Sequence, residues 1–338
     1  MENKVTLKEL SKILNVSIST VSKALNDSSE ISHETRQRVK ELAKLNNYLP
    51  NAMAQNLKKK STRTIGVIIP AILPQFFSKV LHGIETRANK LGYKVIVCIS
   101  NESLEKEKDG ILTLITSQVD GLIISLARET QTMGSYDHFQ MVSQYNIPLV
   151  LFDRVTSQID CDKVIIQDRE EARKATAALF RSGCKNVAYF SAISHTSVDN
   201  ERKRGYEMAC ENLNKRIFTY TVETNEDFDK FFQHEFIKRS IDGILVADEL
   251  TAILLMKTAL KRGLQIPLDL SVIGFANGTM GEHFITSLSV VDQRAMDQGI
   301  QAVDLVVDRI EGRTKEDPVE VSLEATFIYR ESTRLISA

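Results

Sequence analysis

The chain has 338 residues, of which 43% are hydrophobic, and 43 Lys and Arg against 44 Asp and Glu give it a net charge of −1. This composition argues for a globular protein and against fibrous and disordered classes. No run of eighteen apolar residues occurs, and the N-terminus, MENKVTLKEL, lacks the basic and apolar regions of a leader peptide, so we expect a cytoplasmic protein that does not enter a membrane.

The charge is unevenly distributed along the chain. Residues 1–64 hold 12 Lys and Arg against 6 Asp and Glu, which leaves 31 against 38 for the remainder. A basic head on an acidic body indicates that only the head meets a polyanion. A basic surface that is merely solvated would have the same composition, so this alternative stays open.

The head is expected to form three short helices. Thr6 and Glu9 form a capping-box pattern at the start of TLKELSKILNVS, where apolar residues recur at helical spacing. Ser17 is the expected N-cap of a second helix that follows at once, and such close succession indicates a helix-turn-helix. A third helix is expected from Ser32 to Asn46. The core of this domain should comprise Leu10, Leu14, Val21, Leu25, Val39 and Leu42.

The second helix, within VSISTVSKALND, has an unusual outer face. If Val21 faces the core, Ile18 points toward water together with Ser19, Ser22 and Lys23. A basic, hydroxyl-rich face in a basic domain favours DNA binding. Small helical domains also serve protein contacts, and Ile18 could instead pack on the first helix.

A short apolar segment follows the head, in NAMAQNLKKKSTRT. Asn51 can cap a segment of two turns that ends just before Lys58, Lys59 and Lys60. So short a helix does not hold in isolation. The pattern suits a hinge that folds only against DNA and a partner copy, and a flexible basic linker is the alternative.

The body has the pattern of a doubly wound α/β fold. The strand-like runs TIGVIIP, YKVIVCIS, VDGLIIS and IPLVLFD alternate with helix-length segments, as in a parallel sheet with helices on both faces. A shift of 122 residues places Gly83 on Gly205, Leu91 on Leu213, and VDG on IDG. We expect two similar lobes, although short apolar runs also match by chance.

Two such lobes place the carboxyl ends of their strands at a common cleft, where ligands of this architecture bind. Carboxylates and amides exchange hydrogen bonds with hydroxyl groups, and an aromatic ring covers the apolar face of a sugar. Each candidate has a structural alternative: Asp153 could cap a helix, and Phe76 and Phe77 could be core. The candidates just beyond strands are Pro74, Phe76, Phe77, Ser125, Asp153, Arg154, Asp248, Glu249 and Asn277.

Catalysis and metal binding find no support in the sequence. No GxGxxG, Walker A, GxSxG or HExxH motif occurs. His195 and His283 have no evident acid or nucleophile partner, and the four cysteines form no CxxC pair. We expect no catalytic residue, no metal site and no cofactor.

The stretch VTLKELSKILNVSISTVSKALN, with the following ISHETRQRVKELAKLNNYLPNAMAQNLKKKSTRTIGVIIP, resembles the lactose-repressor/galactose-repressor family of bacterial transcription factors. The resemblance continues through VDGLIIS, IPLVLFDR and LSVIGFANG to YREST and covers essentially the whole chain. It implies a helix-turn-helix domain over residues 1–50, a hinge helix and linker over 51–63, and a periplasmic-binding-protein-like effector and dimerisation domain over 64–338. The first lobe would span about 64–160 and 293–322, and the second about 161–292 and 323–338.

The resemblance also implies DNA contacts. Ile18, Ser19 and Lys23 match positions that reach base edges in the major groove, and Leu57 matches a leucine that inserts into the minor groove. Gln55 replaces a frequent arginine, which puts one backbone contact in doubt. The expected DNA-binding residues are Thr6, Ser17, Ile18, Ser19, Thr20, Ser22, Lys23, Asn26, Asn51, Ala54, Gln55, Leu57 and Lys58.

For the effector, the resemblance adds Arg202 from the second lobe and Gln293 near the crossover between lobes. Ala276 replaces a frequent aspartate, which leaves Asn277 as the nearest polar group and puts the usual contact with a sugar hydroxyl in doubt. The expected effector-binding residues are Phe76, Phe77, Ser125, Asp153, Arg154, Arg202, Asp248, Asn277 and Gln293.

The function implied is a ligand-responsive transcriptional regulator that binds a pseudo-palindromic operator as a homodimer. Effector binding between the lobes would switch the pairing of the hinge helices. Repression of carbohydrate or sugar-acid utilisation genes is expected, and Arg154, Arg202 and Lys203 would suit an anionic effector such as a uronate. Nucleobase-like and phosphorylated ligands, and activation in place of repression, stay open. The alternative is a sugar-binding protein or enzyme whose basic head contacts RNA or protein.

Overall fold

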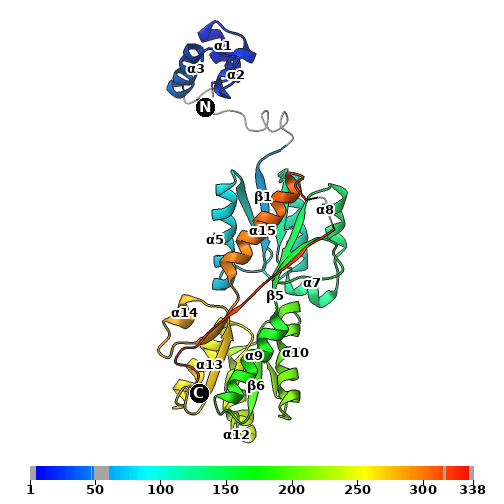
Figure 1. Ribbon diagram of the computed structural model, residues 1–338, viewed down its shortest axis with the longest axis vertical. Helices are drawn as coiled ribbons and strands as arrows, with labels where there is room; N and C mark the ends of the chain where they lie inside the picture. The colour runs from blue at the N-terminus through cyan, green and yellow to red at the C-terminus, as the bar shows by residue number, and fades with distance from the viewer. Residues whose placement is uncertain (1–4, 47, 49–60, 315–316, 335–338) are drawn as a thin grey trace. The chain divides into compact units, whose positions relative to one another are not determined.

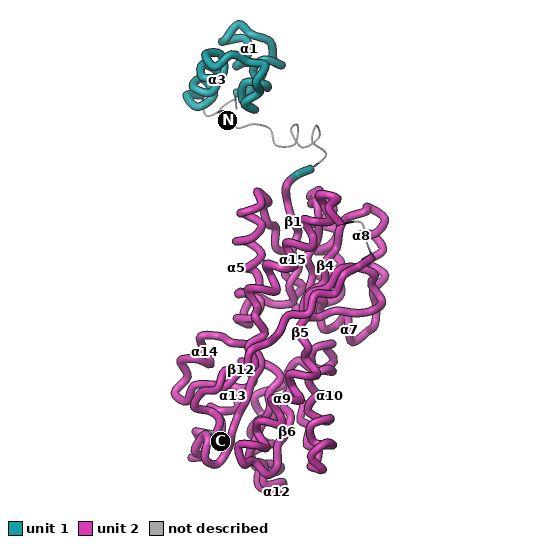
Figure 2. Tube along the Cα trace, viewed as in Figure 1, with its two compact units in different colours: residues 1–62 teal, residues 63–338 magenta. Residues whose placement is uncertain are grey.

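The computed structural model describes residues 5–46, 48, 61–314 and 317–334 and divides into two compact units, residues 1–62 and 63–338 (Figure 2). In the first unit, the described helices are α1 (Leu7–Leu14), α2 (Ile18–Leu25) and α3 (His33–Leu45). They pack around Leu10, Val21, Ala24, Val39 and Ala43, while the expected core residues Leu14, Leu25 and Leu42 are only partly buried against this cluster.

The helices of the first unit begin at the expected caps. The Oγ1 of Thr6 accepts a hydrogen bond from the backbone N of Glu9 at 3.3 Å, and the Glu9 carboxylate accepts one from the N of Thr6 at 2.7 Å. The Oγ of Ser17 accepts one from the N of Thr20 at 3.0 Å. Local hydrogen bonds therefore fix both helix starts of the helix-turn-helix, as predicted.

The second unit contains two sheets of the same topology, each with six described strands. Their orders are β11-β5-β4-β3-β1-β2 and β12-β10-β9-β8-β6-β7, and all pairs are parallel except β10 with β12. The first lobe comprises β1 (Thr64–Ile69), α5 (Gln75–Lys90), β2 (Lys94–Ile99), α6 (Leu104–Thr116), β3 (Gly121–Ile124), α7 (Arg128–Met133), the 3₁₀ turn η1 (Asp137–Phe139), α8 (Gln140–Gln144), β4 (Leu149–Phe152), β5 (Asp162–Ile166), α15 (Ala295–Ile310) and β11 (Glu320–Leu323).

The second lobe has a sheet with the corresponding strand order. It comprises α9 (Asp168–Arg181), β6 (Val187–Ser191), α10 (Ser197–Asn212), β7 (Thr219–Thr221), α11 (Asn225–Lys230), the π-helical turn η2 (Phe231–Glu235), α12 (Phe236–Arg239), β8 (Gly243–Val246), α13 (Glu249–Lys261), β9 (Ser271–Phe275), α14 (Thr279–Glu282), β10 (Ser289–Asp292) and β12 (Thr326–Ile328). The fold is thus a helix-turn-helix head and a two-lobed α/β body.

The expected repeat of 122 residues is confirmed by the helices that follow the first strand of each lobe. Both ends of α5 shift onto the ends of α10, and both ends of β3 shift onto those of β8. Gly83 and Gly205 also have equivalent surroundings. A Cβ on Gly83 would lie 2.2 Å from the carbonyl O of Met296, and a Cβ on Gly205 would lie 2.0 Å from the carbonyl O of Arg169. Glycine at these positions lets α5 approach α15 and α10 approach α9.

The chain passes between the lobes three times in the described residues, after β5, after β10 and after β11 (Figure 1). The first crossing corrects the expected boundary at 160–161. Asp162 to Ile166 form β5, which pairs with β4 and β11 in the first sheet, so the chain leaves the first lobe only after Ile166. The apolar run VII of β5, residues 164–166, belongs to the first sheet. It was not assigned to a strand from the sequence alone.

Candidate functional site

The outer face of α2 is solvent-exposed, as expected. Val21 and Ala24 are fully buried, whereas Ile18 is 46% exposed and is not among the residues packed against the head core. Ser19 is exposed as well, and Ser22 and Lys23 are partly exposed. The structure therefore places an apolar side chain at the start of a polar, basic helix face with no protein core beside it.

The side chains of several expected DNA-binding residues form hydrogen bonds at the ends of α1 and α2. The hydroxyls of Thr6, Ser17 and Thr20 are all engaged in the N-terminal caps of α1 and α2. Asn26 ends α2, and its Nδ2 donates to the carbonyl O of Ser22 at 2.8 Å. These groups position the backbone of the helix-turn-helix.

Lys23 on α2 forms an ion pair with Glu30, and this hydrogen bond lowers the pKa of the Glu30 carboxyl. Both side chains are largely exposed, so the pair contributes little to stability. The lysine can exchange this carboxylate for an acceptor on a ligand.

The expected hinge residues cannot be placed. Asn51, Ala54, Gln55, Leu57 and Lys58 lie outside the described residues. Their assignment stays a prediction.

A cavity of about 240 Å³ lies between the two lobes at the carboxyl ends of their strands. Its place agrees with the rule that doubly wound sheets bind ligands at those ends. The expected effector residues that line it are Phe76, Phe77, Asp153, Arg154, Arg202, Asp248 and Gln293.

Arg154 enters this cavity from the first lobe. It is 4% exposed, and its Nη1 lies 2.6 Å from Oε2 of Glu102. Glu102 also accepts a hydrogen bond from the N of Arg128 at 2.9 Å. Among the described residues, the Nε of Arg154 has no hydrogen-bond partner.

Arg202 enters from α10 in the second lobe and is 2% exposed. Its Nε donates to Oδ1 of Asp168 at 2.7 Å, and its Nη1 donates to the carbonyl O of Ala247 at 2.6 Å. The guanidinium lies over the ring of Phe275, 4.1 Å from its centroid. Within the described chain, Nη2 is left without a partner.

The carboxyl groups in the cavity and next to it are deeply buried. Burial raises the pKa of Asp153 despite the nearby Arg202 and Arg154, and Asp153 accepts one long hydrogen bond from Nε2 of Gln293 at 3.4 Å. Burial also raises the pKa of Asp168 to about 6. Asp153 has a φ of 56°, the left-handed region that aspartate tolerates better than most residues.

Asp248 has a structural role beside its place in the cavity. Its Oδ1 accepts from the N of Thr251 at 2.9 Å and its Oδ2 accepts from the Thr251 hydroxyl at 2.6 Å, so it caps α13. Glu249 follows it and accepts from the N of Gly281 at 2.8 Å. Burial raises the pKa of both carboxyls.

Two expected effector residues do not line the cavity, and both are corrections. The amide of Asn277 is held by Asp292 at 3.0 Å and by Arg330 at 2.8 Å, because the second lobe uses it to join β9 to the chain after β12. Ser125 is fully buried behind the cavity, and its hydroxyl has no partner in the described structure.

Sequence reasoning missed several apolar lining residues: Leu73, Ile193, Val198, Leu250, Phe275 and Met280. Ile193 follows β6, so the strand-end rule would have found it if VAYFS had been recognised as a strand. Leu250 follows the candidates Asp248 and Glu249, and Phe275 precedes Ala276, which the sequence marked only as a replaced aspartate. Val198 and Met280 lie on helices that carry no such signal.

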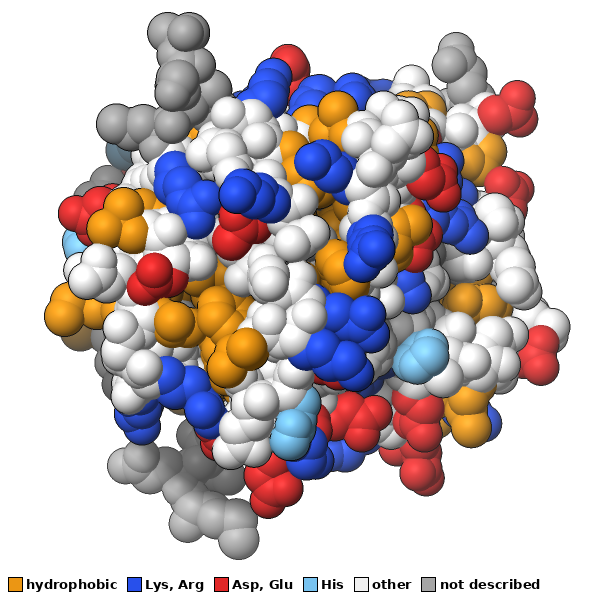
Figure 3. Space-filling model, turned by 90° about the horizontal axis from the view of Figure 1, so that it is seen from below, with side chains coloured by type: hydrophobic (Ala, Val, Ile, Leu, Met, Phe, Trp, Pro, Cys, Tyr) orange, Lys and Arg blue, Asp and Glu red, His pale blue; other side chains and the backbone are white. Residues whose placement is uncertain are grey.

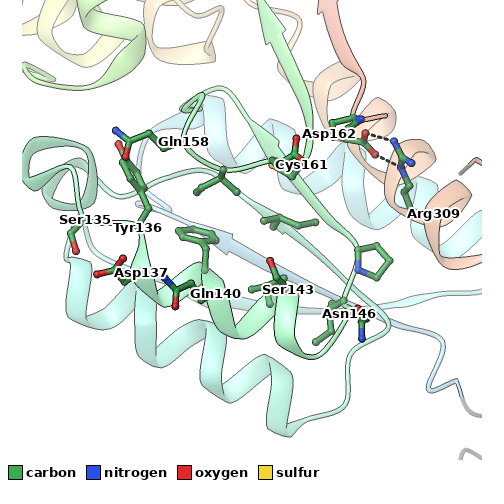
Figure 4. A pocket seen from close by; sticks show the side chains of 18 of the residues that line it. Ser135, Tyr136, Asp137, Gln140, Ser143, Asn146, Gln158, Cys161, Asp162 and Arg309 are labelled. Carbon is green, nitrogen blue, oxygen red and sulfur yellow. Dashed lines mark hydrogen bonds and ion pairs between the residues drawn. The ribbon is translucent and has the colours of Figure 1, made fainter. Parts of the chain in front are cut away.

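A second, more open hollow of about 790 Å³ lies within the first lobe (Figure 4). It has an apolar floor and a rim that includes Ser135, Tyr136 and Gln140, and its ion pair of Asp162 with Arg309 is complete at 2.8 Å. None of the expected effector residues lines it. In contrast to the cleft, no buried donor in this hollow lacks a partner among the residues that the structure describes.

Lysine and arginine side chains alternate with aspartate and glutamate on the molecular face seen in Figure 3, with apolar side chains between them. That face therefore shows no continuous basic surface in this view. Across the described ranges, no helix is long and apolar enough to cross a membrane.

Comparisons with known proteins agree with this geometry. Residues 6–51 match the family described as bacterial regulatory proteins, lacI family, and residues 176–333 match the periplasmic binding protein-like domain. The sucrose operon repressor of Pediococcus pentosaceus is 31% identical over 317 residues, which cover 91% of this chain and 93% of that protein. The ribose operon repressor of Halalkalibacterium halodurans is 28% identical over 331 residues, 97% of each chain.

Solved structures share the fold. The lac repressor dimer bound to operator and the anti-inducer ONPF superposes with a TM-score of 0.85 at 22% identity, covering 98% of this chain and 99% of that one. A LacI family regulator from Enterococcus faecium with bound ribose gives a TM-score of 0.71 at 24% identity, covering 80% of this chain and 99% of that one.

Proposed function

The chain belongs to the lacI family of bacterial regulatory proteins, and from that premise we propose that it represses carbohydrate or sugar-acid utilisation genes in response to an effector. Members of this family are DNA-binding regulators and not enzymes, which agrees with the absence of catalytic motifs from the sequence. A regulator of chromosomal genes works in the cytoplasm. The relatives named as sucrose and ribose operon repressors support a carbohydrate effector.

The observation that carries the proposal is the outer face of α2. Helix α2, which Ser17 caps, presents Ile18, Ser19 and Lys23 to solvent. The domain that contains it has more basic than acidic residues. An isoleucine suits a thymine methyl group, and a lysine suits the guanine acceptors of the major groove. We assign base readout to these three residues.

The proposal includes a homodimer on a pseudo-palindromic operator, because each head reads one half-site. An exposed edge of the first sheet supports it. Strand β2 is an edge strand of this sheet, and its Ile96, Val97 and Ile99 remain exposed. Apolar side chains on an open strand edge favour pairing with another chain.

The effector is assigned to the cleft between the lobes, where it would bias their relative arrangement and thereby the pairing of residues 51–57. A coupling of about 1 to 3 kcal/mol is enough for a useful switch. Leu57 would insert at the operator centre.

The test is fluorescence anisotropy with a DNA duplex from the protein's own upstream region, at one fixed salt concentration. Lys23→Ala should weaken binding by about 5- to 150-fold, the equivalent of about 1 to 3 kcal/mol for a base contact. Lys261→Ala removes the same charge from the exposed side of α13 and should leave binding unchanged. If the wild-type protein binds the duplex no better than a scrambled one, the proposal is wrong and RNA or protein contact by the head becomes the better explanation.

A further inference from the structure

The charge balance of the cleft opposes an anionic ligand, although two arginines line it. Arg154 is already paired with Glu102, and Arg202 is already paired with Asp168. The carboxylates of Asp153, Asp248 and Glu249 line the same cavity. Two guanidinium groups therefore face five carboxyl groups. A buried anion would have to compete with these carboxyls for Arg154 and Arg202, which are both already engaged.

The unpaired hydrogen-bonding atoms show which groups a ligand must bring. Within the described residues, the Nε of Arg154 and the Nη2 of Arg202 are buried donors without acceptors. Asp153 offers acceptor capacity, since Gln293, at 3.4 Å, is the one described side chain whose hydrogen bond to it is seen. An ammonium group cannot accept from the arginines, whereas a hydroxyl group both accepts and donates.

The apolar walls and the volume of the cavity indicate the shape and size of the ligand. The rings of Phe76 and Phe77 pack edge to face with centroids 5.2 Å apart, and Phe275 lies in the opposite lobe. Such rings cover the C–H face of a small ring. The cavity of about 240 Å³ is smaller than the roughly 300 to 1,000 Å³ of pockets for drug-sized ligands, which fits one ring and not two.

We infer that the cleft takes a neutral, polyhydroxylated ligand of a single ring, a monosaccharide, and that it rejects sugar acids, sugar phosphates and disaccharides at neutral pH. The inference rests on the proposed function, in which this cleft is the effector site. It replaces the expectation of a uronate, which counted the arginines without their carboxylate partners.

The first experiment is a thermal-shift measurement on the full chain at pH 7.5. The probes are D-glucose with D-glucuronate, D-galactose with D-galacturonate, D-ribose with ribose 5-phosphate, and sucrose. At least one neutral monosaccharide should raise the Tm in a saturable manner, and its charged partner and sucrose should not. Tighter binding of an acid, a phosphate or sucrose overturns the inference, and so does the absence of a shift with every neutral monosaccharide.

A second experiment reverses the charge preference. Glu102→Gln keeps the shape of the side chain and removes the charge that neutralises Arg154, so glucuronate or galacturonate should gain at least tenfold in affinity relative to the neutral sugar. Glu105→Gln removes the same charge from the exposed side of α6 and should leave the preference unchanged. Asp168→Asn makes the same test at Arg202 from the second lobe if Glu102→Gln fails to fold. An unchanged preference in the folded variants contradicts the inference.

Operator binding measured without any sugar separates the two proposals. Specific operator binding with no preference for neutral sugars would refute the inference and leave the proposed function standing. A clear preference for neutral sugars in a protein that does not bind its operator would refute the proposed function.

Discussion

The head and the cleft use carboxyl groups in opposite ways. In the head, hydrogen bonds from Thr6, Lys40 and Lys23 lower the pKa of Glu9, Asp27 and Glu30, which all lie at the surface. In the cleft, burial raises the pKa of Asp153, Asp248 and Glu249, and beside it burial raises the pKa of Asp168. The head thus keeps these carboxyls at the surface, where hydrogen bonds favour their charged form, whereas the cleft buries carboxyls whose charged form needs a specific arrangement of partners.

The largest expected effect breaks the arrangement in the cleft. Arg202→Ala removes the guanidinium that faces the buried carboxylates of Asp168 and Asp153, and we expect a loss of about 3 to 5 kcal/mol in the free energy of unfolding. Urea unfolding followed by circular dichroism measures it. Arg204→Ala lies on the same helix with a side chain 61% exposed, and a loss of at most about 1 kcal/mol is expected there. Equal losses in the two variants would contradict a special role for the buried pair.

The next largest effect is expected from a change in the hydrophobic core of the head. Leu10 is fully buried among three helices, so Leu10→Ala should lower the stability of the head by about 2 to 5 kcal/mol. That is a large part of the stability of so small a domain. We expect operator binding to be lost while the sugar-induced thermal shift of the body persists. Ile13→Ala, at a site 59% exposed on the same helix, should change stability by no more than about 0.5 kcal/mol.

The sequence predicted those features that depend on interactions between residues close together along the chain. The helices of the head begin at Thr6 and Ser17 because of hydrogen bonds to residues three positions away, so the printed sequence contains their cause. The rule of strand ends placed five of the seven expected effector residues around one cavity, and the family resemblance supplied Arg202 and Gln293.

Partners that are distant along the chain were not predicted. Arg154 is paired with a residue 52 positions earlier and Arg202 with one 34 positions earlier, which no local pattern reveals. Asn277 is taken up by Arg330, 53 positions later. Two arginines near a cleft therefore suggested an anionic effector, whereas in the structure each of them is paired with a carboxylate.

A smaller effect sharpens the assignment of readout to the head. Exchanging Ile18 and Ser19 keeps the composition of α2 and moves the apolar side chain by one position. We expect the preferred base to change at one or two positions of the half-site, with about 1 to 3 kcal/mol of discrimination per base pair. Competition against half-sites substituted one base pair at a time measures this. Ile13→Ser replaces an exposed isoleucine on α1 and should leave the preferred sequence as it is, whereas an unchanged preference after the exchange rules out direct readout.

The smallest expected effect is a pH dependence that separates the two regions. Asp168, which faces Arg202, Asp153 and Glu201, has a pKa of about 6 in the folded protein, above the value of about 3.9 for an unfolded chain. Its contribution to stability is therefore fully present below the unfolded pKa and is lost as the pH rises through about 6. The lowered pKa values in the head have the opposite sign, because their contributions are present above the unfolded values and are lost only in stronger acid.

Between pH 7.5 and 5.5 the body should therefore gain about 1 kcal/mol from Asp168, while the three head carboxyls change little because this range lies above their unfolded values. Asp168→Asn should flatten the gain, since the amide does not titrate. Thermal unfolding of both proteins across this range makes the comparison, with the head followed separately through operator binding. If the wild-type body gains no more stability than Asp168→Asn between pH 7.5 and 5.5, the prediction fails. The charge of Arg202, and not burial, would then determine the pKa of Asp168.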